Sequence, residues 1–125
     1  MSKPEIILAR SAGFCFGVQR AVSKVYDETD RGGDIYTYGP IIHNTEVVAD
    51  LEKRGVHVVE SAEEISSLKQ GTVIIRSHEV SREIDTLIRE SGLRCIDATC
   101  PFVKQIHRTV EAARKKKKKI VIIGN

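Results

Sequence analysis

The chain alternates short apolar runs with segments whose apolar residues recur at helical spacing, and this alternation is what most restricts its fold. Short apolar runs predict strands, whereas a repeat of three or four residues predicts helices. Alternating strands and helices favour a parallel sheet with helices on both faces, which is an α/β fold. The predicted strands are residues 5–9, 34–39, 56–59, 72–76, 93–97 and 120–124.

Helix boundaries are predicted by residues with specific backbone preferences. Gly55 and Gly92 follow helix-period segments and fit the position just after a helix end. Ser61 and Glu64 have the spacing of a capping box, which predicts a brief helix after the third predicted strand. Pro101 fits the first turn of a helix that follows residues 93–97. These signals divide the chain into units of a strand followed by a helix.

Composition restricts the class of protein. The chain has 125 residues, of which 41% are hydrophobic and 30% charged, an ordinary balance for a globular domain with a core. No apolar run reaches the ~18 residues of a membrane span, and the N-terminal apolar stretch is too short for a signal peptide. We therefore expect a cytoplasmic protein without a membrane partner. In that compartment its three cysteines are expected as thiols, ligands or core residues rather than as disulfides.

The net charge of +3 comes from one run, residues 114–119, and the rest of the chain is net negative. Cations suit the last turn of a helix because they face the negative end of its dipole. The run is therefore predicted to be a solvated helix end. Nucleic-acid binding is disfavoured because no aromatic stacking residues accompany the run.

Four residues capable of chemistry follow predicted strands and precede predicted helices: Cys15, His43, His78 and Cys100. In a parallel sheet such turns share one edge, and open α/β folds bind ligands at that edge. The helix N-termini there favour anions, which include thiolates and phosphates. The pattern predicts one site that contains two thiols and two imidazoles.

Other candidate motifs are weaker. Cys95 begins a C-x4-C motif, but an extended strand would separate its two sulfurs by roughly 16 Å, so Cys95 is expected to pack in the sheet. His57 is expected as an ordinary strand residue and His107 as a surface residue of a helix. Cys15 and Arg20 enclose a loop one residue shorter than the phosphate loop of cysteine phosphatases, so that class is disfavoured.

Four motifs, GFCFGVQRA, GPIIHN, RSHEV and DATCPFV, together resemble the 4-hydroxy-3-methylbut-2-enyl diphosphate reductase family, in the order that family shows and over essentially the whole chain. The resemblance implies that Cys15 and Cys100 are two of three cysteines that hold an iron–sulfur cluster (4Fe-4S) with one open iron. It also implies that His43 and His78 bind the diphosphate of the substrate.

The implied reaction removes the substrate hydroxyl group as water, with two electrons and protons, and gives isopentenyl and dimethylallyl diphosphates. A ferredoxin or a flavodoxin is the implied electron donor. Iron can act as a Lewis acid on an alkoxide, and imidazoles and helix N-termini suit a diphosphate. The resemblance therefore agrees with the chemistry predicted from the residues alone.

The resemblance also implies an incomplete chain, because the family enzyme is roughly twice as long and has three similar α/β units. Residues 1–99 are expected to form the first unit, with residues 1–13 available to pair with a further unit, and residues 100–125 the truncated start of a second. The third cysteine ligand, a third histidine and an acidic proton donor are absent. Glu79 also replaces the glycine usual after the histidine of RSHEV.

We therefore expect the N-terminal part of the reductase, inactive by itself. The alternative is a stand-alone α/β module without catalytic activity, or a fragment that associates with copies of itself through exposed apolar surface.

Overall fold

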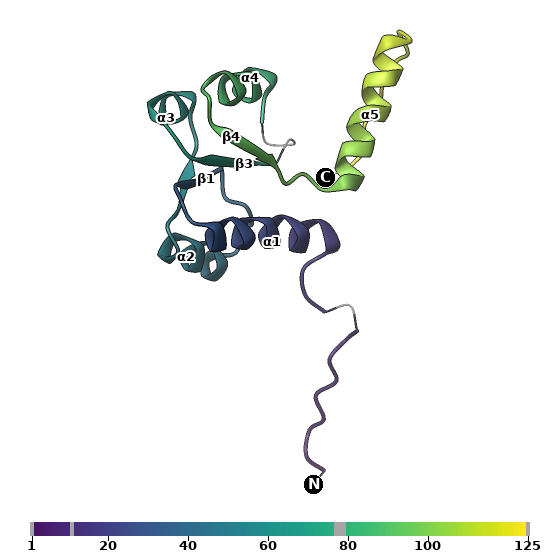
Figure 1. Cartoon of the computed structure of the whole chain (residues 1–125). Coiled ribbons are helices and arrows are strands. Elements are labelled where there is room, and N and C mark those ends of the chain that lie inside the picture. Colours follow the sequence, from purple (N-terminus) through teal and green to yellow (C-terminus); the bar gives the residue numbers. More distant parts are fainter. Residues whose placement is uncertain (1, 11, 77–79, 125) are drawn as a thin grey trace.

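The computed structural model describes residues 2–10, 12–76 and 80–124, and within these ranges it is an alternating α/β structure (Figure 1). Each strand from β1 onward is followed by a helix, as the sequence predicts. The elements are α1 (Phe16–Arg31), β1 (Ile35–Tyr38), α2 (Thr45–Lys53), β2 (Val56–Val59), α3 (Ala62–Ser67), β3 (Thr72–Ile75), α4 (Arg82–Glu90), β4 (Arg94–Asp97) and α5 (Pro101–Lys115).

The four strands form one parallel sheet in the order β2-β1-β3-β4. Helices α1 and α2 lie on one face of this sheet, and α3 and α4 lie on the other (Figure 1). The predicted parallel sheet with helices on both faces is thereby confirmed. Because the strands are parallel, the segments that leave them towards α2, α4 and α5 all begin at the same edge of the sheet.

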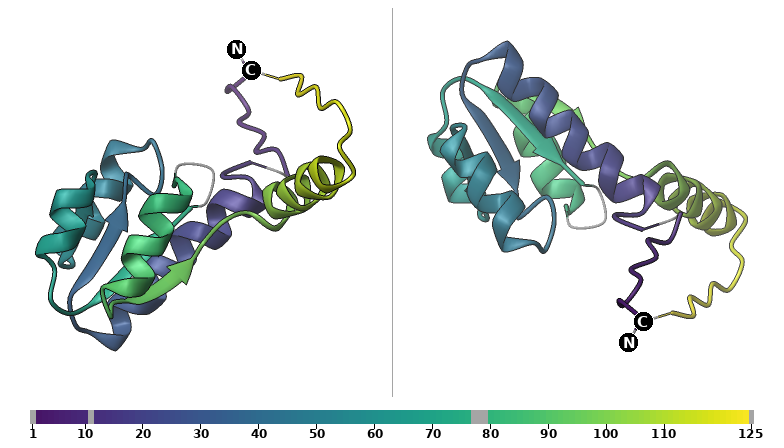
Figure 2. Two further views of the ribbon diagram at one scale, coloured as in Figure 1. Left: turned by 90° about the horizontal axis from the view of Figure 1, so that it is seen from above. Right: turned by 90° about the horizontal axis from the view of Figure 1, so that it is seen from below.

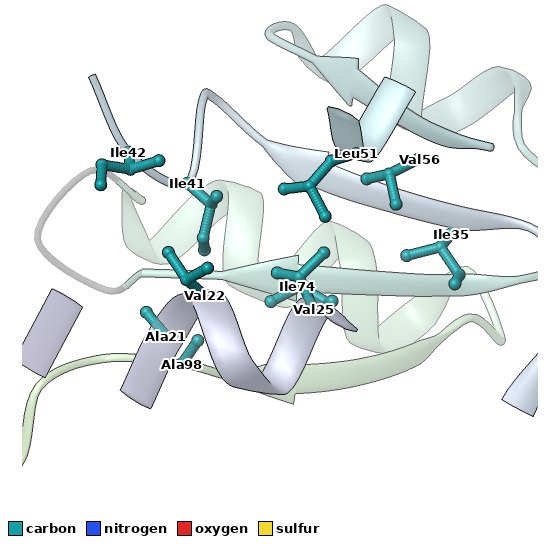
Figure 3. Packing of buried hydrophobic residues seen from close by; sticks show 10 residues of the cluster. All are labelled: Ala21, Val22, Val25, Ile35, Ile41, Ile42, Leu51, Val56, Ile74 and Ala98. Atoms are coloured by element: carbon teal, nitrogen blue, oxygen red, sulfur yellow. The ribbon is translucent and has the colours of Figure 1, made fainter. Parts of the chain in front are cut away.

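The hydrophobic core has two parts, one on each face of the sheet. Val25 of α1 and Ile74 of β3 are fully buried in the first part, which α1 and α2 cover (Figure 3). Ile65 of α3 and Ile88 of α4 are fully buried in the second part, on the opposite face. Helices α1 to α4 therefore bury their apolar sides against the sheet, as the helical spacing predicts.

The predicted helix boundaries are confirmed. Ser61 and Glu64 form a capping box, in which the Ser61 hydroxyl accepts from the Glu64 amide and the Glu64 carboxylate accepts from the Ser61 amide. Gly55 and Gly92 follow α2 and α4 with φ of 90° and 79°, a backbone region that glycine adopts without strain. Pro101 is the first residue of α5.

The strands predicted at residues 5–9 and 120–124 are wrong in this structure. Neither segment has regular secondary structure, and Ile7 and Ile122 are 81% and 76% exposed. A strand needs a neighbour whose backbone satisfies its amides and carbonyls. Among the described residues, no strand pairs with either segment.

Helix α5 extends away from the sheet, and no residue within it is buried (Figures 1 and 2). It is amphipathic nonetheless, and Phe102 and Ile106 are exposed on it. No helix in the described ranges is both long enough and apolar enough to cross a membrane.

The basic run only partly matches its prediction, because α5 ends at Lys115 and the remaining lysines follow the helix. The Lys117 amide donates to the Arg114 carbonyl and the Lys118 amide donates to the Ala113 carbonyl, which together form a Schellman motif. Lys117 is therefore left-handed, with φ of 55°, at a position where glycine is favoured.

We predict that Lys117→Gly stabilises the end of α5. Relief of the left-handed conformation is worth about 1 kcal/mol, so the Lys117 and Lys118 amides should exchange with solvent about fivefold more slowly. Hydrogen exchange followed by NMR measures this effect. Lys116→Gly is the matched control, because Lys116 has an ordinary φ of −81° and its replacement should give no stabilisation. Equal effects of the two substitutions would contradict the prediction.

Candidate functional site

Cys15 and Cys100 occupy equivalent places in the fold, because each is the residue that precedes the first turn of a helix. Cys15 precedes α1 and Cys100 precedes α5, and neither side chain makes a capping hydrogen bond. Cys100 also follows β4 closely, as predicted, whereas the described residues before Cys15 (2–10 and 12–14) contain no strand. Both thiols are free. They are therefore available at the positive ends of two helices.

The structure brings these two cysteines to one pocket of about 290 Å³. Most of its other lining residues are small and apolar, and Arg76 is the charged residue among them. The pocket combines two soft sulfur donors with walls that offer few competing polar groups. Its remaining lining residues are Gly17, Val18, Ala21, Arg76, Ala98 and Val103.

Gly17 allows α1 to approach Cys100 closely. A Cβ atom at Gly17 would lie 2.6 Å from Sγ and 2.8 Å from Cβ of Cys100, closer than real contacts allow. The same junction is supported by Phe16 and Phe102, whose rings meet edge to face with their centroids 6.3 Å apart. The beginnings of α1 and α5 therefore pack directly on each other at the pocket.

The turn from β4 to Cys100 is held by polar contacts from two helices. Lys24 of α1 donates to the Asp97 carbonyl at 2.8 Å, and Arg20 donates to the Thr99 carbonyl at 3.4 Å. The Asp97 carboxylate accepts from the Thr99 amide at 2.9 Å and pairs with Lys104 of α5 at 2.8 Å. Thr99 is fully buried in this turn.

Burial, hydrogen bonds and neighbouring charges shift two pKa values at this turn. Burial on its own raises the pKa of Asp97, but hydrogen bonds from Lys104 and Thr99 outweigh burial and hold this pKa below its ordinary value. Burial lowers the pKa of Lys24, as do the nearby charges of Arg20 and Lys104. The contribution of the Asp97 contacts to stability is therefore complete above the ordinary carboxyl pKa and is lost as pH falls through the lowered value.

His43 is exposed and lines a different pocket, of about 400 Å³, beside the beginning of α2. There the Asn44 side chain caps α2 by accepting from the Val47 amide. Ile42, adjacent to His43, packs in the same core cluster as Ala21, which lines the cysteine pocket. His43 thus lies at the predicted edge of the sheet, but it does not line the cysteine pocket. His78 lies outside the described residues.

The less favoured candidates lie where the sequence placed them. Cys95 is half-buried on β4 and packs against the second core cluster, and burial raises the pKa of its thiol. His57 is exposed on β2, next to the Tyr36 ring, and His107 is exposed on α5.

Sequence reasoning did not identify Arg20, Lys24 and Asp97 as residues of the site. The available signals were the four-residue spacing of the two cations on one helix and the Asp-x-Thr turn sequence.

Comparison with known proteins identifies the family of this chain. Residues 6–125 match the family described as LytB protein. The chain belongs to the LytB family. A curated LytB relative from Caldanaerobacter subterraneus, named 4-hydroxy-3-methylbut-2-enyl diphosphate reductase, is 46% identical over 97% of this chain. A protein of the same name from Thermoanaerobacter sp. is 44% identical over 97% of this chain.

Solved structures place the fold in the same group. A (E)-4-hydroxy-3-methyl-but-2-enyl diphosphate reductase, described as the terminal enzyme of the non-mevalonate pathway, superposes with a TM-score of 0.77 at 41% identity over 96% of this chain. The Plasmodium falciparum reductase superposes with a TM-score of 0.76 at 31% identity over 86% of the chain. The LytB chain spans 43% of the length of the two curated relatives, and 42% and 33% of these two solved chains.

Proposed function

We propose that this chain supplies the N-terminal part of a 4-hydroxy-3-methylbut-2-enyl diphosphate reductase, in which Cys15 and Cys100 are ligands of an iron–sulfur cluster. The shared pocket of these two cysteines carries the proposal, because the residues are distant in sequence and lie at two separate helix ends. Thiolates are the usual protein ligands of such clusters, and helix N-termini favour them.

The donor set fits a cluster in kind but is short in number. Two thiols face one pocket, and among the described residues no group of three or more Cys, His, Asp or Glu side chains could hold a metal. At least one further ligand must therefore come from outside the described residues. When bound, a 4Fe-4S cluster supplies electrons and an iron that acts as a Lewis acid on the substrate hydroxyl group. Val18, Ala21 and Val103 give the pocket an apolar lining beside the exposed Cys15 and the half-buried Cys100.

The proposal assigns His43 and His78 to the substrate diphosphate. Support comes from the position of His43 beside the N-terminus of α2, where an anion is stabilised by the helix dipole. A ferredoxin or a flavodoxin is the proposed electron donor, and the proposed location is the cytoplasm. Free cysteines are ordinary in that compartment.

A second candidate function is a module that associates with itself or with other chains and has no activity of its own. The favouring observation is the exposed apolar surface on three segments, which include Ile7, Phe102 and Ile123. Surfaces of this kind generally pack against another protein surface. Self-association would leave the cysteine pocket without a role, or would let two copies contribute ligands to one cluster.

Anaerobic reconstitution with iron and sulfide tests the proposal. With an added small thiol to supply the missing ligands, we expect this chain to bind iron with visible absorption typical of a cluster, and Cys15→Ser or Cys100→Ser to reduce the bound iron by about tenfold. Cys95→Ser is the matched control, because Cys95 packs against the core away from the pocket and its loss should leave iron binding unchanged.

Light scattering on the same samples separates the two candidate functions. A folded chain that binds no iron in any oligomeric state would contradict the ligand assignment and favour the module. Iron bound only in an oligomer, and lost on Cys15→Ser, would assign the missing ligands to a second copy.

A further inference from the structure

The contacts around the Cys100 turn lead to an inference about what sets the distance between the two cysteines. Cys100 is the last residue of a short turn that leaves β4, and that turn makes hydrogen bonds to α1 through Lys24 and Arg20. Helix α1 also carries Cys15 at its beginning. The helix that presents one thiol therefore binds the backbone that presents the other.

We propose that Lys24 and Arg20 are positioning residues that fix Cys100 relative to Cys15 before any metal binds. The inference rests on the proposed function for its biological meaning. The hydrogen bonds from Lys24 and Arg20 are nevertheless made by the metal-free protein. Lys24 is the stronger contact, since its ammonium donates to the Asp97 carbonyl at 2.8 Å, whereas the contact from Arg20 is 3.4 Å.

Further contacts within the turn, and from β3 and α5, hold its backbone in the conformation that Lys24 and Arg20 bind. Asp97 accepts from the Thr99 amide within the turn, and the Ala98 amide donates to the Ile75 carbonyl of β3. Lys104 pairs with the Asp97 carboxylate from α5, so the two helices hold the same residue from two sides. With sheet, α1 and α5 all attached, the turn has little freedom to carry Cys100 away from the pocket.

This arrangement would favour metal binding by holding the two cysteines in place beforehand. Sulfurs that are already close need less ordering when a metal binds, so the binding free energy is not spent on closing the site. Gly17 provides the space for the approach, and the two cations provide the attraction. Contacts to main-chain carbonyls also hold the turn without adding a side chain that could compete for metal.

The experiment uses the metal-free chain with Cys95→Ser, so that Cys15 and Cys100 are the two thiols present. Dibromobimane becomes fluorescent when both of its arms react with thiols, and its yield reports how often the two sulfurs are within reach of each other. We expect Lys24→Met to lower this yield several-fold, and Lys24→Arg, which keeps a donor, to restore most of it. Lys53→Met, a lysine on the exposed end of α2, is the matched control and should change nothing.

Hydrogen exchange at the Ala98 and Thr99 amides gives a second readout that does not depend on the thiols. Lys24→Met should speed exchange there while the amides of β1 stay protected, which separates loss of the turn from loss of the fold. Unchanged bridging and unchanged exchange in Lys24→Met would overturn the inference. Failure of the proposed function would look different. The dibromobimane yield would still fall in Lys24→Met, but the reconstituted chain would contain no bound iron.

Discussion

Replacing Gly17 by alanine should separate the two cysteines and abolish most of their joint reactivity. The added methyl group would lie 2.6 Å from Sγ and 2.8 Å from Cβ of Cys100. Rotation of the Cys100 side chain can move its sulfur, but it cannot move its Cβ. The beginnings of α1 and α5 must therefore shift apart. This shift also disturbs the edge-to-face contact between the rings of Phe16 and Phe102.

Two opposing effects decide how Gly17→Ala changes the free energy of unfolding. Alanine favours the helix by up to ~1 kcal/mol over glycine, and overpacking costs about 1–3 kcal/mol. We expect a net loss of stability, because the clash involves a Cβ close to the backbone. Urea unfolding measures this loss, and dibromobimane bridging should fall about tenfold. Gly124→Ala is the control, since nothing lies within 4 Å of a Cβ there. Bridging equal to that of the unaltered chain would contradict the predicted separation.

The arrangement of the sheet could be predicted because local signals and burial agree in its strands and helices. Pro101, Gly55 and the Ser61–Glu64 capping box fix helix boundaries through backbone properties that do not depend on the rest of the fold. The two cysteines were predicted to lie together and do line one pocket, but only Cys100 follows a strand as predicted, because residues 5–9, expected as the strand before Cys15, have no regular structure. His43 lies beside α2 at the predicted edge of the sheet, in a neighbouring pocket.

The contacts that fix the Cys100 turn could not be predicted, because they join side chains to main-chain carbonyls far away in sequence. Lys24 and the Asp97 carbonyl become neighbours only when α1 packs over the end of β4. Nothing in the residue types distinguishes Lys24 from an ordinary solvated lysine. Distances of this kind require the folded backbone, and they are the part of the site that sequence reasoning missed.

One tripeptide shows why the strand prediction failed at the end of the chain. The sequence Val-Ile-Ile occurs at residues 73–75 and again at residues 121–123. The first copy is β3, with side chains no more than 3% exposed, and the second has no regular structure, with side chains 76–95% exposed. Strand β3 has β1 and β4 as neighbours, whereas no described strand pairs with residues 121–123. Identical local preference therefore leads to opposite burial, because pairing partners decide the outcome.

Substitution of the central isoleucine in each copy should separate these two environments. Ile74→Ala removes a fully buried side chain between α1 and the sheet and should cost about 2–5 kcal/mol of stability (Figure 3). Ile122→Ala changes an exposed side chain and should alter stability by less than about 0.5 kcal/mol. Both variants lose the same atoms, so a difference in stability between them reports the difference in burial of the two side chains.

Urea unfolding at low protein concentration measures both variants without interference from self-association. The slope of free energy against urea should be the same for Ile74→Ala and the unaltered chain, which would show that the cost comes from the folded core. A loss of stability for Ile122→Ala close to that for Ile74→Ala would mean that residues 121–123 are buried by the chain itself. The exposed apolar segment would then have a partner within this sequence, and the argument for an external packing surface would fail with it.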